Sequence, residues 1–454
     1  MSYFSLHNHT DYSNAALGFS DCINKTEDLI QYAYDIGLNG VCITDHECIS
    51  GYVQALNYYN KMQKDRPFVL GLGNECYLLT KEEYENNLNG EANTSFYHFI
   101  ILALDTEGYH QICKLTTRAW ERAWFKGVWR RPTLYEDLEE IVKPSQGHVV
   151  ASTACLGGRI DKLLLEQSQN VNTEVERLIE IFGKNNIYLE VQPPKDDTCD
   201  QAVVNKAMYW LGVEHGLPVI PTTDSHYLRK EDALIHKVFL QSQDGEREVD
   251  DFYATAYMMS ADELREHLQI DFTDEQINQM YQWSNELEER IKGYDIFHNP
   301  IIPQIPIDKI PEFKIEHLFE AYYSSHPSFA WYAKREDIHE KYFFYQVEQG
   351  LMSKVVKKGK NTEAYIDRLE LEWNELKKIS ELLNNSMVSY YSTMAELIDI
   401  MWGVGSFVGA GRGSSAGFLT TYLLDITQVD PVPLGDYLPY WRHIALERGA
   451  EIAD

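Results

Sequence analysis

Short apolar runs alternate with amphipathic stretches over roughly the first 230 residues of this 454-residue chain. Runs rich in β-branched and aromatic residues predict strands, and apolar residues spaced three or four positions apart predict helices, as in 25–36 and 173–182. The expected strands are 3–6, 40–44, 68–72, 98–104, 148–152, 187–191 and 218–222. Strands that alternate with helices predict an α/β fold, in which successive βα units surround a parallel sheet or barrel.

The pattern changes after about residue 250. A proline-rich segment at 298–306 has the composition of a linker or an extended crossing segment. Helical periodicity is present in 262–267, 273–292, 365–384 and 394–402. The second half is therefore expected to be mostly helical with a small sheet. We place two domains in the chain, at 1–255 and 256–454.

The composition is that of a soluble globular protein, with 44% hydrophobic and 24% charged residues. We expect a cytoplasmic protein with reduced thiols, because the N-terminus lacks signal-peptide character and the seven cysteines are scattered. The formal net charge of −30 argues against a general basic surface for nucleic acid. DNA would have to meet local arginines, bound metals or a partner chain. The acidity could equally serve solubility alone.

Side chains that can bind metal recur at the ends of the expected strands. They are His7, His9, His46, Glu75, His98, Cys155, Asp224 and His226. In βα folds the chemistry gathers at one rim, so these groups are expected to meet. Asp45, beside His46, is expected to orient a ligand rather than to bind metal. Cys155 could also be a small core residue, although its position favours ligation.

Donors of nitrogen, oxygen and sulfur in this number exceed the needs of one zinc ion. They suit a cluster of two or three ions of zinc, manganese or iron. Adjacent ions can bind a phosphate, lower the pKa of a water molecule and stabilise a leaving oxygen. The sequence therefore predicts phosphoester hydrolysis without a protein nucleophile.

These motifs resemble the polymerase and histidinol phosphatase (PHP) domain that opens bacterial and phage DNA polymerase III alpha subunits. The resemblance implies a distorted barrel of seven βα units and nine metal ligands, with Asp21 as the ninth and Asp11 as its competitor. It also implies retained hydrolysis, as a 3′→5′ proofreading exonuclease. The catalytic residues that it implies in this domain are His9, His46, Asp224 and His226.

A glycine-rich segment, 408–417, precedes an apolar stretch near the end of the sequence. Glycines allow close approach of phosphate, a following helix N-terminus favours negative charge, and Arg412 adds a fork-shaped donor. Taken alone, such a segment is usually only a turn. Its continuation to Pro431 resembles the nucleotide-binding start of the palm in the same polymerase family.

The palm resemblance implies that Arg412, Gly413 and Ser414 contact the triphosphate of an incoming deoxynucleotide. Arg442 and Arg448 lie in its arginine-bearing segment. Asp454 matches the first of the magnesium-binding carboxylates of nucleotidyl transfer, and the sequence ends there. We therefore expect that this chain does not polymerise DNA alone.

The interpretation that joins both motifs is an N-terminal fragment or subunit of a replicative polymerase. It would combine a metal-dependent exonuclease with half of a nucleotidyltransferase site, and its partners would be a DNA primer-template, a deoxynucleoside triphosphate and a second polypeptide. Two alternatives remain open. The chain could be a free-standing phosphatase that acts on a small phosphate monoester, or a non-catalytic structural subunit of a replicase.

Overall fold

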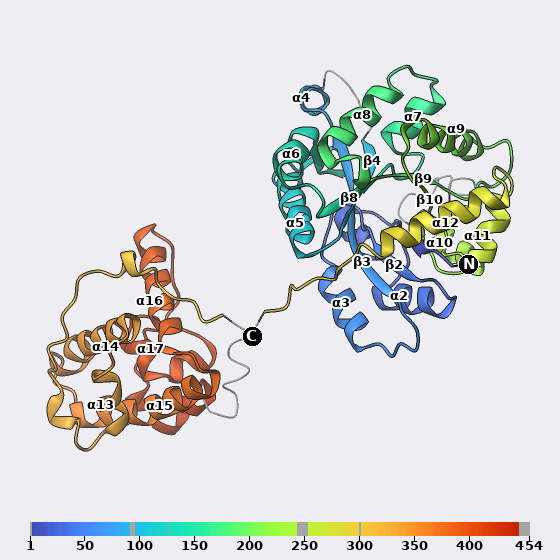
Figure 1. Cartoon of the computed structure of the whole chain (residues 1–454). Coiled ribbons are helices and arrows are strands. Elements are labelled where there is room, and N and C mark those ends of the chain that lie inside the picture. Colours follow the sequence, from blue (N-terminus) through green and yellow to red (C-terminus); the bar gives the residue numbers. More distant parts are fainter. Residues whose placement is uncertain (1, 91–95, 127, 243–252, 299–300, 445–454) are drawn as a thin grey trace. The chain divides into compact units, whose positions relative to one another are not determined.

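The computed structural model describes residues 2–90, 96–126, 128–242, 253–298 and 301–444 (Figure 1). The chain forms two compact units, Met1–Ile296 and Phe297–Asp454. The boundary lies just before the proline-rich segment, and the first unit includes the two helices that follow residue 255. Among the described residues, no helix has the length and apolar character needed to cross a membrane.

The first unit is built on a nearly closed, eight-stranded sheet, in which seven strands follow one another in the order β1-β2-β3-β4-β8-β9-β10. These seven strands are β1 (Phe4–Ser5), β2 (Gly40–Ile43), β3 (Val69–Leu79), β4 (Tyr97–Ala103), β8 (Val149–Ser152), β9 (Ile187–Val191) and β10 (Val219–Pro221). A parallel bridge between Asn8 and Ser225 joins the segments that follow the first and last strands. The sheet thus approaches the distorted barrel that the family resemblance implies.

Two features of the strands differ from a simple parallel barrel. Strand β4 runs antiparallel to both of its neighbours, β3 and β8. Strand β3 continues to Leu79, past the expected end at residue 72, and also pairs with β7 (Pro132–Leu134). Because β4 is reversed, its first residues lie at the rim where the parallel strands end. His98, near the start of β4, therefore lies opposite Tyr77 of β3.

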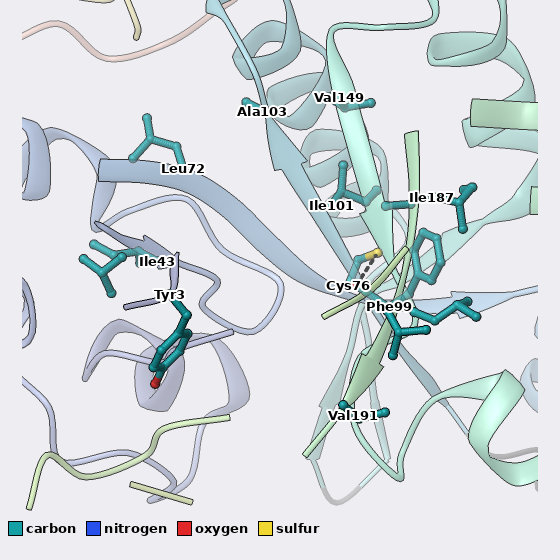
Figure 2. Close-up of a cluster of buried hydrophobic side chains, with 14 of the residues drawn as sticks. Tyr3, Ile43, Leu72, Cys76, Phe99, Ile101, Ala103, Val149, Ile187 and Val191 are labelled. Atoms are coloured by element: carbon teal, nitrogen blue, oxygen red, sulfur yellow. Dashed lines mark hydrogen bonds between the residues drawn. The ribbon is translucent and has the colours of Figure 1, made fainter. Parts of the chain in front are cut away.

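Helices cover the sheet because its strands carry apolar side chains on both faces. Figure 2 shows part of the larger buried cluster, including Ile43, Leu72 and Phe99, which packs with helices such as α2 and α8. A second cluster packs with Leu287 of α12. The helices are α1 (Tyr12–Leu17), α2 (Thr26–Asp35), α3 (Tyr52–Lys61), α4 (Lys81–Asn89), α5 (Thr106–Glu121), α6 (Tyr135–Ile141), α7 (Arg159–Leu165), α8 (Val171–Phe182), α9 (Asp200–His215), α10 (Ala233–Gln241), α11 (Ala261–Leu268) and α12 (Asp274–Glu288).

Between α5 and α6, strands β5 (Trp124–Lys126) and β6 (Val128–Arg130) form a separate two-stranded antiparallel sheet. The sequence analysis did not predict this hairpin. Its signal is the presence of aromatic residues on both sides of Gly127.

The second unit is helical around a core that contains Trp373. The ring of Phe329 stacks on Trp373 with centroids 5.2 Å apart, and Tyr332 and Phe343 pack around the same indole. The helices are α13 (Pro327–Ala333), α14 (Ile338–Leu351), α15 (Thr362–Leu383), α16 (Val388–Gly403) and α17 (Leu419–Leu423). The small sheet expected here was wrong for residues 301–444, which contain no strand.

Candidate metal centre

The structure brings all nine expected metal ligands together at the rim of the barrel. His7 and His9 follow β1, Asp21 follows α1, His46 follows β2, Glu75 lies in β3, His98 lies in β4, Cys155 follows β8, and Asp224 and His226 follow β10. Eight of these residues are buried, whereas the side chain of His98 is 25% exposed. The cluster can therefore be reached from the side of His98.

The first ligand group combines His7, His9, Glu75 and Asp224. Glu75 Oε2 lies 2.9 Å from the Nε2 atoms of both His7 and His9. Asp224 Oδ1 lies 3.2 Å from His7 Nε2 and 3.1 Å from His9 Nε2. Metal–ligand bonds of about 2.0–2.2 Å put the ligand atoms of one tetrahedral ion about 3.3 Å apart, so these four atoms have suitable spacing.

The second ligand group combines His9, His46 and His226. Asp21 extends it, since its Oδ2 atom lies 3.2 Å from His46 Nε2 and 3.1 Å from His226 Nε2. Its competitor Asp11 lies apart and pairs with Lys25. Of the two aspartates that the sequence left open, the structure brings Asp21 to the cluster.

The third ligand group combines Glu75, His98 and Cys155. Glu75 Oε1 contacts His98 Nδ1, and Cys155 Sγ lies 3.4 Å from the same nitrogen. Glu75 thus gives one oxygen to the first group and the other to the third, while His9 belongs to both the first and the second. The three groups therefore form one continuous site with shared ligands.

The buried oxygens of this cluster fit divalent ions. Glu75 Oε1 and Asp224 Oδ1 are fully buried and accept no hydrogen bond of correct geometry, although imidazole nitrogens lie close to both. Buried carboxylates without such partners are costly unless a cation compensates them. The mixed donor set and the shared carboxylate suit two or three ions of zinc, manganese or iron type.

The titration behaviour of the cluster reflects its crowded opposite charges. Burial opposes protonation of His9, but the carboxylates of Asp224 and Glu75 outweigh it and raise the pKa of His9 to about 10. Burial alone would raise the pKa of Glu75, whereas the neighbouring imidazoles hold that pKa well below its usual range. In the metal-free chain, protons on imidazoles therefore balance the carboxylates, and bound ions would displace them.

Two carboxylates outside the ligand set orient its histidines. Glu190 in β9 lies 3.0 Å from His7 Nδ1 and accepts hydrogen bonds from the hydroxyls of Ser152 and Thr222. Sequence reasoning missed Glu190, and the available signal was a charged residue inside a buried strand. Asp45 accepts a hydrogen bond from Ser13, whose hydroxyl lies 3.2 Å from His9 Nδ1. Asp45 thus acts on the cluster through Ser13 rather than as a ligand.

A pocket of about 490 Å³ borders the ligands Cys155 and Asp224. Its other walls include Thr223 and residues from the loops after β9 and before α11, such as Gln192 and Thr255. This volume is large enough for a small ligand to reach the edge of the ligand cluster.

The glycine-rich segment of the second unit is exposed at Arg412, Gly413 and Ser414. Gly413 and Ser414 line a pocket of about 470 Å³ together with Arg442. The expectation that the following helix N-terminus receives phosphate was wrong. The buried carboxylate of Glu372 already accepts hydrogen bonds from the first amides of α17, at Leu419 and Thr420. Arg448 and Asp454 lie outside the described residues.

Comparisons with known proteins match both parts of the chain. Residues 5–194 match the PHP domain, and residues 341–454 match the bacterial DNA polymerase III alpha NTPase domain. A DNA-directed DNA polymerase of Bacillus phage SPbeta is 37% identical over 97% of this chain and 35% of its own length. The DNA polymerase III subunit alpha of Borreliella burgdorferi is 26% identical over 95% of this chain and 33% of its own length.

The corresponding subunit of Thermus aquaticus is 24% identical over 96% of this chain and 36% of its own length. The chain thus spans about a third of the length of these relatives. Both domains occur in the order that the sequence motifs predict. The chain is therefore a relative of bacterial and phage DNA polymerases of the DNA polymerase III alpha type, and it contains a PHP domain followed by sequence of the DNA polymerase III alpha NTPase domain.

Proposed function

We propose that the first unit is a metal-dependent phosphoesterase that removes nucleotides from DNA in the 3′→5′ direction. The observation that carries this proposal is the convergence of eight donor residues in three groups that share Glu75 and His9, with Asp21 beside the second group. A structural zinc site needs only four ligands. A larger set with one partly exposed member suits hydrolysis, because substrate and water need access to ions that are held close together.

Each ligand group of the cluster would hold one ion. His7, His9, Glu75 and Asp224 would hold one ion, Asp21, His46 and His226 a second, and Glu75, His98 and Cys155 a third. Bound ions would supply Lewis acidity for the phosphate and for an attacking water. Glu190 and Ser13 keep the imidazoles of His7 and His9 in the orientation that points Nε2 into the cluster.

We further propose that the second unit contributes to a nucleotidyltransferase site. Arg412, Gly413 and Ser414 would contact the triphosphate of a deoxynucleotide, with Arg442 on the wall of the same pocket. Magnesium would bind Asp454 and further carboxylates. The relatives are about three times as long. Polymerisation would therefore need further polymerase sequence, in the same polypeptide or in a second one.

The hydrolytic proposal is tested with a primer–template that carries a labelled 3′ mismatch, incubated with the purified chain and manganese or zinc. We expect release of the terminal mononucleotide, and a loss of at least about 100-fold in rate in His9→Ala and His46→Ala. His215→Ala, on the exposed end of α9, is the matched control and should keep full activity.

Retained nuclease activity in both cluster variants would contradict the assignment of the site. Hydrolysis of a small phosphate monoester without any DNA digestion would instead favour a phosphatase. Bound metal without either activity would favour a structural subunit.

A further inference from the structure

The hairpin β5–β6 exposes aromatic rings next to the metal centre. Phe125 is 64% exposed and Trp129 is 43% exposed. The two residues are cross-strand partners, and their ring centroids lie 5.5 Å apart. Exposed π faces are surfaces on which nucleobases stack.

Positive charge accompanies these rings in a strongly acidic chain. Residues 118–131 contain five Lys or Arg residues and one acidic residue, in a protein of net charge −30. Arg118 and Arg122 are neutralised by Asp137. Arg131 is buried and donates a hydrogen bond to the Ala16 carbonyl. Arg130 lies 4.9 Å from the ring centroid of Phe96, and it forms no ion pair with any residue that the structure describes. Arg130 is therefore a cation available to a phosphate.

Direct packing connects the hairpin to the metal ligands. Phe96 contacts Trp124 of the hairpin, with centroids 5.8 Å apart, and also Tyr77, at 6.3 Å. The Tyr77 hydroxyl lies 3.3 Å from His46 Nδ1, and its ring lies 5.1 Å from that of His98. The hairpin therefore lies on the side where the exposed ligand, His98, opens the cluster.

We propose that the β5–β6 hairpin is a stacking platform for single-stranded DNA, which guides a 3′ end toward the metal centre. This inference rests on the proposed function and names its substrate class. Bases would stack on Phe125 and Trp129, while Arg130 would contact a backbone phosphate. A small phosphate monoester would not need such a platform, because it could reach the cluster through the 490 Å³ pocket alone.

The platform is tested by fluorescence anisotropy, with a labelled oligothymidylate and the full chain in EDTA, where no hydrolysis occurs. Phe125→Ala and Trp129→Ala are each expected to weaken binding by about tenfold, the effect of losing one stacked base. Arg130→Gln should reduce the slope of log affinity against log salt by about 0.7, as expected for one lost phosphate contact on a single strand.

The matched control is Trp210→Ala in α9, because Trp210 is 64% exposed, as is Phe125, but lies on another element. It should leave oligothymidylate affinity unchanged. Equal affinity of the wild type and the three hairpin variants would overturn the proposal, and so would an equal loss in Trp210→Ala.

A second readout separates the platform from hydrolysis. Cleavage of bis(p-nitrophenyl) phosphate with manganese should be unchanged in Phe125→Ala and Arg130→Gln, because neither residue is a metal ligand. Loss of this activity in both variants, at full metal content, would contradict a role limited to DNA binding. If the wild type cleaves no ester while the hairpin variants still lose oligothymidylate affinity, the proposed hydrolysis fails and the platform stands.

Discussion

At the scale of single residues, the metal centre depends on side chains that belong to two ligand groups at once. Glu75 directs its two oxygens to different groups, and His9 lies between the first and the second. A change at Glu75 would therefore affect more than one bound ion, whereas His9 offers one nitrogen, Nε2, and would bind a single ion. Residues outside the ligand set contribute by fixing ring orientation, as Glu190 does for His7.

Glu190→Gln tests this orienting role. The substitution keeps the size of the side chain but removes the negative charge of the carboxylate, whose oxygens accept hydrogen bonds from His7 Nδ1, Ser152 and Thr222. We expect metal affinity to fall by about 10–100-fold with the fold intact. Competition with a metal-binding dye measures the affinity, and Glu180→Gln on the exposed face of α8 is the control. If Glu190→Gln binds metal as tightly as Glu180→Gln does, the orienting role of Glu190 is refuted.

The affinity for metal should rise with pH. The folded-state pKa of His9 is raised to about 10, so its proton stabilises the metal-free chain below the ordinary value of 6.5, and this stabilisation is lost as pH rises through 10. A divalent ion must displace this proton. We expect apparent affinity to increase by up to about tenfold per pH unit for each proton released.

Titration calorimetry between pH 6 and 9, in buffers of different ionisation enthalpy, counts the released protons. Binding that is independent of pH and releases no proton would show that the imidazoles are already neutral.

At the scale of elements, strand direction decides which side chains meet. His98 reaches the ligands because β4 is antiparallel and begins at the rim where β3 carries Glu75. Apolar runs in the sequence predict strands but not their direction, because side-chain alternation is the same in both orientations. The seven barrel strands were therefore predictable from sequence, whereas the reversal of β4 was not.

The same limit applies to parts of the site. Eight donor residues stood out in the sequence because they recur at strand ends, and the family resemblance added Asp21; the structure brings all nine together. Glu190 and the β5–β6 hairpin did not stand out in the sequence. Glu190 lies inside a buried strand, and the hairpin becomes relevant only through its packing on Phe96. The helix terminus expected to bind phosphate is occupied by Glu372, a contact between residues that are distant in sequence.

Glu372 is expected to hold α17 and the glycine-rich segment in place. Its carboxylate is fully buried and accepts from the Leu419 and Thr420 amides as well as from Arg368. Glu372→Ala leaves these donors without an acceptor, so the free energy of unfolding should fall by about 3 kcal/mol or more. Urea unfolding followed by circular dichroism measures the change. Glu381→Ala, exposed on the same helix, should have little effect, and equal stabilities of the two variants would contradict the role of Glu372.

At the scale of the whole molecule, the chain combines strong overall acidity with a local surface of exposed aromatic rings and Arg130. Its net charge of −30 would repel DNA at a distance, so the proposed binding would have to depend on short-range contacts and on bound ions. The two compact units correspond to the two family matches, since the first contains the PHP match and the second most of the NTPase-domain match.

The proposed metal centre is a shared cluster of ions at the rim of the barrel. Anomalous X-ray diffraction from crystals of the chain grown with zinc, collected on both sides of the zinc edge, locates such ions directly. We expect two or three peaks among the nine donor residues, with one peak between Glu75, His7, His9 and Asp224. Zinc peaks confined to other parts of the chain, with none among these residues, would contradict the proposed centre.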